Sequence, residues 1–511
     1  MPGKSQNPCI KRRSINLLAA QGMMIGAAFE SGGSLLLRKV PGRDIFQAPP
    51  PACRRGKRWR ETMEEEMKKG LVFLGGLGLV TILLLSFGCN GSSSSNAQVA
   101  QPPGQFEQTQ ANANLMLEEG KQTFRFDTFG DQVFWGDALR LHDAIKGLAL
   151  GGVGPGVSPN TALAVGLKVD SDALPPVLKS QLAAGQIDLD APAVTVELLR
   201  LNAVLGVTGF FDAQGNLVSM GIQCALCHST VDDSFAAGIG RRLDGWANRD
   251  LNVGAIIALA PDLTPFTTLL GVDDATVRAV LNGWGVGKFD AELLLDGKTV
   301  GPQGSAATLL PPAFGLAGVN LHTWTGWGSV SHWNAFVANI EMNGQGTFFD
   351  PRLNDAVKFP IAAREGFGDI RRTPDQVTAK LAALHFYQLA IAAPTPPAGS
   401  FDVAAAQRGE VLFGGQAGCA RCHVPPLFTE PGWNMHTAAE IGVDDFQALR
   451  SPDERYRTAP LKGLWTHMQG GFYHDGRFAT LLDVINHYDT LFVLGLTEPE
   501  KADLGEYLKS L

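Results

Sequence analysis

The sequence predicts a mainly α-helical protein with two domains, the first of them enlarged by loop-rich insertions. A Cys-x-x-Cys-His run occurs twice, at residues 224–228 and 419–423. Amphipathic segments with helical period lie around both copies. The 60 glycines and 30 prolines indicate many turns and loops between these helices. Because 511 residues are enough for more than one core, we expect one domain over 116–400 and another over 401–511.

Each pentapeptide has the spacing required for covalent attachment of a c-type haem. Two thiols add to the vinyl groups of the ring, and the adjacent imidazole binds the iron. The alternatives are a thiol redox pair or half of a zinc site, but no further Cys-x-x-Cys completes a zinc ribbon and no thioredoxin-like pattern surrounds either copy. We therefore predict two attached haems, with iron ligands His228 and His423 and attachment residues Cys224, Cys227, Cys419 and Cys422.

The charge of the chain excludes nucleic acid as its natural partner. The formal net charge is −8. Residues 89–511 carry 28 Lys and Arg against 44 Asp and Glu, which is a net charge of −16. A polyanion is repelled by such a surface. An acidic surface suits a basic redox partner instead.

The first 115 residues predict export and a membrane anchor. Residues 67–89 combine a basic start, an apolar run and Cys89, as in a signal peptide ending in a lipoprotein box. A simple cleaved signal and an uncleaved helix are the alternatives. Residues 1–66 are basic and unpatterned, which indicates a non-native extension, and residues 90–115 have the composition of a flexible tether. These features predict a periplasmic, lipid-anchored protein.

Two helices are expected to enclose the second haem. Residues 401–412 form an amphipathic segment that ends at Gly414-Gly415, and Thr497 begins a capping box that opens the last helix. This order of helix, haem loop and helix is that of the cytochrome c fold. In the first domain, residues 114–134 are expected to form a helix, followed by a cluster of aromatic residues.

The sequence between the second haem motif and the last helix repeats one in the first domain. Residues 460–464 align with 312–316, and Gly476 aligns with Gly326. An amphipathic helix follows in both cases, over 481–488 and 332–342. We interpret this as an internal repeat of the haem-binding unit.

Two haem motifs, the segment RTAPLKGL and the segment FYHDGRFATLLDVINHY resemble the bacterial di-haem cytochrome c peroxidase and MauG family. In that family the second haem takes its sixth ligand fourteen residues after the His of the His-Asp-Gly motif. Counting from His474 reaches Tyr488, as in the MauG branch, with His487 and Met468 as the rival ligands. A phenolate ligand would lower the potential of that haem.

The resemblance implies an open first haem. The family's peroxidases carry a distal His sixteen residues after the proximal one, where this chain has Asp244, a residue better suited to pairing with an arginine. The repeat places the counterpart of Tyr488 near Ala338 or Asn339, which are poor iron ligands. Arg241, Arg242 and Arg249, which follow the motif closely, are candidates for binding the haem propionates, and a solvated surface is their alternative role.

An open haem needs an acid–base group to react with peroxide. Glu341, on the helix expected to cover the first haem, is the leading candidate, and His322 and His332 are the others. Either histidine would close the site if it bound the iron.

These residues predict a periplasmic di-haem oxidoreductase that reacts with peroxide or oxygen and exchanges electrons with a periplasmic donor or acceptor. A non-catalytic electron-transfer cytochrome and an oxygenase acting on an organic substrate are the alternatives. A calcium ion between the domains, as in relatives, stays open.

Overall fold

The computed structural model describes residues 104–511. The described residues all belong to one compact unit. The predicted extension, signal and Cys89 lie outside the described residues. Within residues 104–511, every helix is too short or too polar to cross a lipid bilayer.

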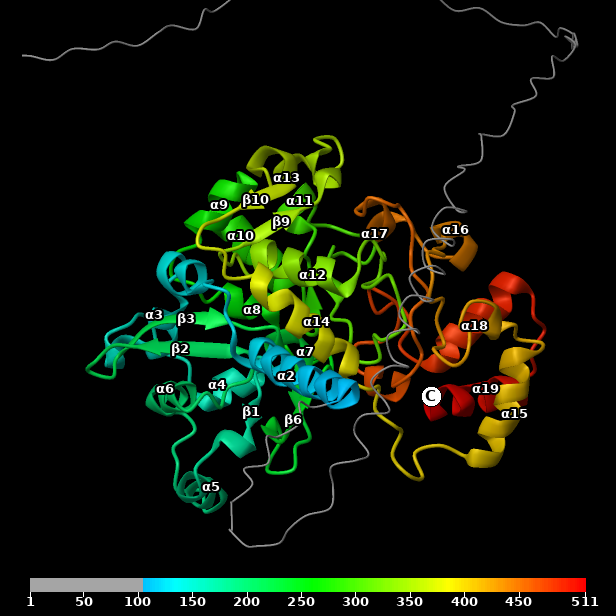
Figure 1. The fold of residues 1–511 in the computed structure, drawn as a ribbon, viewed down its shortest axis with the longest axis horizontal. Helices are drawn as coiled ribbons and strands as arrows, with labels where there is room; N and C mark the ends of the chain where they lie inside the picture. Colours follow the sequence, from blue (N-terminus) through cyan, green and yellow to red (C-terminus); the bar gives the residue numbers. More distant parts are fainter. Residues whose placement is uncertain (1–103) are drawn as a thin grey trace, which may run out of the picture. The chain divides into compact units, whose positions relative to one another are not determined.

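Two pairs of packed helices frame the described part of the chain (Figure 1). Helix α2 (Gln105–Phe126) packs against α14 (Leu381–Ala390). Helix α15 (Val403–Gly414) packs against α19 (Glu498–Ser510), and the capping box predicted at Thr497 is present. The first pair encloses the longer segment of chain and the second pair the shorter one.

Both pairs cross at a glycine. A Cβ added to Gly120 of α2 would overlap the backbone oxygen of Ala383 in α14. A Cβ added to Gly409 of α15 would likewise overlap the backbone oxygen of Asp503 in α19. Because only glycine permits so close an approach, the same helix crossing is built twice in one chain.

The segment between α2 and the first haem motif forms short helices and a hairpin. Strands β2 and β3 pair antiparallel, and β1 pairs in parallel with β5 further along the chain. The elements are the π-helix η1 (Val133–Ala138), α3 (Leu141–Lys146), η2 (Leu148–Leu150), α4 (Pro159–Ala164), β1 (Val169–Asp170), η3 (Ser171–Ala173), α5 (Pro176–Ala183), α6 (Pro192–Arg200), β2 (Val207–Phe211) and β3 (Leu217–Ile222).

The segment from the first haem motif to α14 is also built of short elements. Its sheets are all two-stranded: β4 with β6, β7 with β8, and β9 with β10. The elements are α7 (Ala225–His228), β4 (Ser229–Val231), β5 (Ile239–Gly240), β6 (Arg242–Asp244), α8 (Val253–Ile257), α9 (Thr264–Leu270), α10 (Asp274–Gly283), β7 (Lys288–Phe289), α11 (Leu293–Asp296), β8 (Thr308–Leu309), α12 (Val330–Phe336), the π-helix η4 (Val337–Glu341), β9 (Thr347–Phe349), η5 (Pro351–Asn354), α13 (Pro360–Glu365), β10 (Asp369–Arg371) and η6 (Thr378–Lys380).

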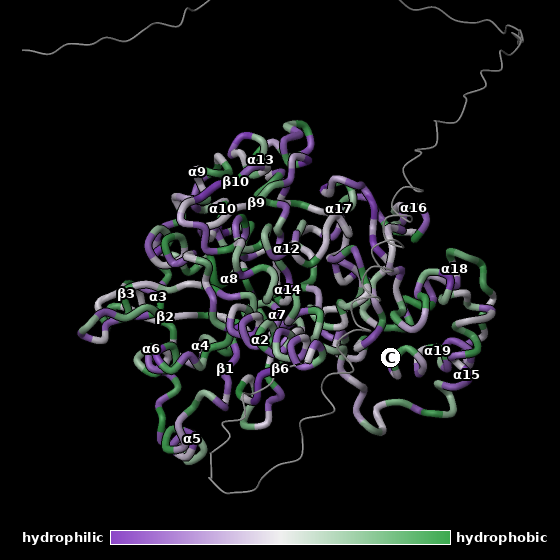
Figure 2. The backbone as a smooth tube through the Cα atoms, viewed as in Figure 1, coloured by the Kyte–Doolittle hydropathy of each residue, from purple (hydrophilic) through white to green (hydrophobic). Residues whose placement is uncertain are grey.

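Between α15 and α19 lie η7 (Cys419–Arg421), α16 (Ala438–Ile441), α17 (Phe446–Leu449), η8 (Leu464–His467) and α18 (Leu481–Phe492). Helices therefore dominate and the sheets are small, as the sequence predicts for a mainly α protein. One hydrophobic core surrounds Leu226 of the first haem motif, and a separate one joins Phe413 of α15 to Leu508 of α19. Figure 2 shows hydrophobic residues in both regions.

The internal repeat is present in the backbone. An isolated antiparallel bridge joins His322 to Gly328, and its counterpart joins Phe472 to Phe478. Both bridges close a loop with a glycine in the left-handed region, Gly326 in the first and Gly476 in the second. Such matched turns confirm the alignment of Gly326 with Gly476.

The repeat extends into the helices that follow each loop. Thr323 and Tyr473 occupy equivalent positions and both have positive φ, 66° and 68°. Ser329 caps α12 and Thr480 caps α18, each accepting a hydrogen bond from the third residue of its helix. Counted from these caps, Tyr488 of α18 corresponds to Val337; counted from the bridges, it corresponds to Ala338, one of the two positions expected from sequence.

The helix expected over 114–134 has different bounds. Helix α2 begins at Gln105, so residues 105–115 are helical rather than part of a tether; they contain Gln, Ala, Leu and Glu, which favour helix, and no Gly or Pro. The helix ends at Phe126, because Asp127 accepts a hydrogen bond from the backbone of Phe129, which has φ +52°. A π-helix then covers 133–138.

Candidate functional site

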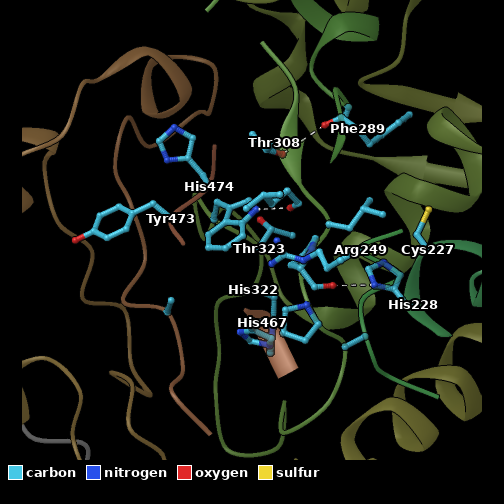
Figure 3. A pocket seen from close by; sticks show the side chains of 18 of the residues that line it. Cys227, His228, Arg249, Phe289, Thr308, His322, Thr323, His467, Tyr473 and His474 are labelled. Atoms are coloured by element: carbon cyan, nitrogen blue, oxygen red, sulfur yellow. Dashed lines mark hydrogen bonds between the residues drawn. The ribbon is translucent and has the colours of Figure 1, made fainter. Parts of the chain in front are cut away.

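A cavity of about 990 Å³ is lined by both Cys-x-x-Cys-His runs. Figure 3 shows Cys227 and His228 of the first run among the lining side chains. Its walls are mainly apolar, and polar side chains reach it at a few points. The volume lies at the upper end of the range for ligand pockets in proteins. The structure thus brings together the two motifs that the sequence separates by nearly two hundred residues.

The first motif places its histidine with one ring nitrogen directed at the cavity. The short helix α7 carries Cys227 and His228, and His228 Nδ1 lies 3.0 Å from the carbonyl oxygen of Pro311. Burial lowers the pKa of His228, so the ring is neutral. Nδ1–H therefore donates to Pro311, which leaves Nε2 as a free lone pair for a metal.

The second motif repeats this arrangement. Cys419 begins η7, and His423 Nδ1 lies 3.2 Å from the carbonyl oxygen of Phe428. Burial lowers the pKa of His423 as well. Both histidines therefore have the tautomer and orientation of metal-binding imidazoles.

The four motif cysteines are unsuited to thiol–disulfide redox chemistry. Burial raises the pKa of Cys224 and Cys227 to about 12 and that of Cys419 to about 11. Reactive thiols have lowered pKa values instead. All four are free and partly buried, which suits covalent attachment of a ring better than a redox pair.

Two buried arginines provide the other half of the fit to a haem. Arg249 and Arg457 line the cavity, and the Nε of each is buried without a hydrogen-bond partner. Burial lowers the pKa of both to about 10, and neither forms a salt bridge within the described residues. A buried guanidinium without an anion is unfavourable, so both side chains need a carboxylate from a ligand, such as a haem propionate.

Of the three arginines named from sequence, Arg249 lines the cavity and the other two lie elsewhere. Arg241 is exposed and bonds Asp232, and Arg242 bonds Asp170; neither lines the cavity. Adjacency to the motif was a poor guide because the strand pair β4–β6 turns these side chains toward other carboxylates. Arg457 was missed, although it opens the RTAPLKGL segment.

Glu341 lies in the cavity wall beside the first motif. It ends the π-helix η4, lines the cavity, and its charge contributes to the raised pKa of Cys227. Burial, aided by the charge of Glu292, raises the pKa of Glu341 itself to about 8. A carboxyl group poised near neutrality beside the first motif can both accept and donate a proton.

Of the two candidate histidines, the structure brings only one to the cavity. His322 lines it, with Nε2 held 3.1 Å from the carbonyl oxygen of Val319 and a buried Nδ1 that has no partner. Burial lowers the pKa of His322 to about 4. His332 instead packs between Trp327 and Phe348, with Nε2 3.6 Å from Asp350, and does not line the cavity.

Tyr488 reaches the cavity from α18, and its rivals do not. Burial and the charges of Cys422 and Cys419 raise its pKa, which places it beside the second motif. His487 is held by the carbonyl oxygen of Ile441 at 2.8 Å, and Met468 is 44% exposed. Neither lines the cavity, so Tyr488 is the better placed of the three.

The equivalent of Tyr488 in the first half of the repeat has no ligand atom. Val337, at the same distance from its helix cap, lines the cavity, and the neighbouring Ala338 is buried. Asp244, at the position of the peroxidases' distal histidine, bonds Arg125, Ser229 and Tyr387 and does not line the cavity. Asp244 does pair with an arginine, but the partner is Arg125, which is distant in sequence, and not one of the neighbouring arginines that were expected.

Two further side chains, His467 and Trp324, line the cavity. His467 has a buried Nε2 without a partner, and burial together with Arg249 lowers its pKa to about 3. Figure 3 shows His467 near His322 and Arg249. Trp324 also lines the cavity, with its indole N–H bonded to the carbonyl oxygen of Leu309 at 2.9 Å.

The described geometry can be set beside known proteins. No protein-family model matches the chain. The chain is 28% identical to the methylamine utilization protein MauG of Methylorubrum extorquens over 227 residues, which is 39% of this chain and 63% of MauG. Over this stretch the chain is a distant relative of MauG. The matched stretch thus falls short of two thirds of that protein's length.

Two solved structures overlap this one in part. Hydrazine synthase of Kuenenia stuttgartiensis, studied under xenon pressure, matches at 18% identity and a TM-score of 0.27. A MauG-like protein associated with microbial copper homeostasis matches at 20% identity and the same TM-score. Each covers 42% of this chain and 76% of the other. Scores this low carry no argument about function.

Proposed function

We propose that this protein is a di-haem c-type oxidoreductase of the MauG and cytochrome c peroxidase type, with a peroxide-reactive site at the first motif and an electron-relaying site at the second. The observation that carries the proposal is the asymmetry of the repeat. Tyr488 enters the cavity beside the second motif, whereas Val337 stands at the equivalent position beside the first. One half of the repeat offers a sixth ligand and the other leaves the position open.

The residues fit two haems, each in a cytochrome c-like domain framed by one of the helix crossings. Cys224, Cys227 and His228 would hold one, and Cys419, Cys422 and His423 the other. Arg249 and Arg457 would bind propionates, since their guanidinium groups have no carboxylate partner within the described residues. When bound, a c-type haem supplies an iron that can bind peroxide and exchange electrons.

Glu341 is the acid–base group in this proposal. Reduction of one peroxide consumes two electrons and two protons and gives two waters. Cleavage of the oxygen–oxygen bond is favoured when a proton moves from the inner to the outer peroxide oxygen. Glu341 would take up the first proton and return it, because its pKa of about 8 lets both protonation states exist near neutrality.

Tyr488 would set the potential of the second site. A phenolate ligand stabilises ferric iron, whereas a thioether favours ferrous iron. The electrons would come from a periplasmic donor protein with a basic docking surface, in keeping with the acidic charge of residues 89–511. The periplasmic location and the lipid anchor are part of the proposal and depend on residues 67–89.

One observation favours a second function. His322 lies in the cavity with a buried, unpartnered Nδ1, and burial keeps its ring neutral. If His322 bound the first iron, both sites would be six-coordinate and the protein would be a di-haem electron carrier without a substrate.

The test is consumption of hydrogen peroxide by the haem-loaded protein with ferrocyanide as the electron donor. The proposal expects steady consumption, with two ferrocyanides oxidised for each peroxide. Failure to consume peroxide, in protein shown to hold two haems and to be reducible, would favour the electron carrier.

A further inference from the structure

A buried ionic cluster lies next to the cavity. Arg450, at the C-terminal end of α17, has a fully buried side chain that bonds Asp290 at 2.9 Å and Asp296 at 2.9 Å. Asp290 and Asp296 are also buried, as is Glu292, whose charge interacts with Arg450. We call Asp290, Glu292, Asp296 and Arg450 the acid cluster.

The acid cluster has more carboxyl groups than cations. Three carboxyls face a single guanidinium, and Oδ2 of Asp290 is buried without a hydrogen-bond partner. Burial raises the pKa of Asp290 to about 7 and raises that of Glu292, against the opposing charge of Arg450. Lys298 lies beside Asp296, so one buried carboxylate has no compensating cation when all three are ionised. Because such a charge is highly unfavourable, the cluster holds a proton near neutral pH.

One member of the acid cluster reaches the cavity. Glu292, the N-cap residue of α11, lines it together with Gln447 and Glu341. Glu292 and Glu341 are close enough for the charge of one to raise the pKa of the other. Two carboxyl groups that line the same cavity can exchange a proton through water molecules.

Another member contacts a side chain that reaches solvent. Asp296 Oδ2 lies 3.6 Å from the ammonium of Lys298, whose side chain is half-exposed. The backbone oxygen of Lys298 also accepts a hydrogen bond from Arg450 at 3.3 Å. The acid cluster therefore extends from the surface at Lys298 to the cavity at Glu292.

The charged side chains that act on Glu292 are Arg450, Asp296 and Glu341. Helix α13 packs against α11, but its Arg364 and Glu365 pair with each other at the surface. Helix α17 contributes only Arg450 and the neutral Gln447, and η4 contributes Glu341.

We propose that Glu292 is a proton carrier that connects Glu341 to the acid cluster, and through Asp296 and Lys298 to solvent. This inference rests on the proposed function, because Glu341 can move a proton between peroxide oxygens but cannot provide the two protons that each turnover consumes. A proton passes from Glu292 to ionised Glu341, and the two aspartates of the acid cluster then return a proton to Glu292. The carboxyl groups are unchanged after each cycle.

The test compares Glu292→Gln, Glu292→Asp and the surface control Glu365→Gln in the haem-loaded protein. Hydrogen peroxide consumption with ferrocyanide is measured across pH, in light and heavy water. For Glu292→Gln we expect turnover to slow about tenfold. This is less than the roughly hundredfold effect at the lower end of direct general acid–base catalysis. We also expect a larger solvent isotope effect and a pH midpoint moved to lower pH, because the charge that raises the pKa of Glu341 is gone.

Glu292→Asp should retain most of the turnover of the unmodified protein, and the control Glu365→Gln should retain all of it. If the unmodified protein consumes peroxide and Glu292→Gln matches it in rate and pH midpoint, the relay is wrong and the proposed function stands. If the unmodified protein does not consume peroxide, the proposed function fails and the relay fails with it.

A measurement on the unmodified protein covers the case in which Glu292→Gln does not fold. Infrared spectra of protein labelled with ¹³C-glutamate should show protonated glutamic acid bands at neutral pH that disappear at alkaline pH. Because Glu341 is itself mostly protonated at neutral pH, the spectra are also recorded on Glu341→Gln. Spectra of that variant in which every glutamate is ionised at neutral pH would overturn the relay.

Discussion

Glu341→Gln should slow the reaction with peroxide and abolish its pH dependence. A pKa of about 8 leaves about one Glu341 in ten ionised at pH 7 and about one in a hundred at pH 6. The second-order rate constant for peroxide should therefore rise about tenfold per pH unit below pH 8 and level off above it. Losing the carboxylate should slow the reaction ~10²–10⁴-fold, or about 3–5 kcal/mol of transition-state stabilisation.

Stopped-flow absorbance of the haem-loaded ferric protein, mixed with excess peroxide between pH 6 and pH 9, measures this rate. Glu365→Gln, an exposed residue of α13, is the matched control and should behave like the unmodified protein. The variant must retain two haems and its melting temperature for the comparison to hold. An unaltered rate and pH slope in Glu341→Gln would refute the acid–base role.

The remaining predictions concern packing, charge and ligation. Arg450→Met should lower the free energy of unfolding by ~3–5 kcal/mol at neutral pH, because it leaves buried carboxylates unpaired. The loss should shrink at acidic pH as these carboxylates become protonated. A pH-independent loss below ~1 kcal/mol in denaturant titrations would contradict this. Gly409→Ala should destabilise by ~1–3 kcal/mol through overlap with α19, whereas Gly505→Ala in α19 meets no neighbouring atom and should be neutral or slightly stabilising by thermal unfolding; equal effects would be evidence against the crossing. Tyr488→Met should raise the reduction potential of the second haem and change its spectrum, and an unchanged potential would transfer the ligand role to His487 or Met468.

Local rules predicted the parts of the fold that local sequence determines. The spacing of the two motifs, the capping box at Thr497 and the aligned glycines Gly326 and Gly476 are each specified by a few neighbouring residues, and the structure has all of the expected turns and caps. The start of α2 was misjudged because the Gln- and Ala-containing stretch before residue 115 suits a helix as well as a tether.

Long-range contacts were beyond what sequence could decide. Arg242 and Arg249 look alike in sequence, yet one pairs with Asp170 and the other enters the cavity, because only the tertiary structure places carboxylates beside some arginines. His322 and His332 are equivalent candidates in the sequence, and only the structure shows that His332, in α12, faces Asp350. The acid cluster joins residues more than 150 positions apart, so no local pattern could reveal it.

Electron paramagnetic resonance of the purified ferric protein, recorded at low temperature with and without hydrogen peroxide, tests the central claim most directly. The account predicts one high-spin signal from the haem beside Val337 and Glu341 and one low-spin signal from the haem bound by Tyr488. Peroxide should abolish the high-spin signal. Two low-spin signals that peroxide leaves unchanged would show that both irons are capped, and would contradict the account.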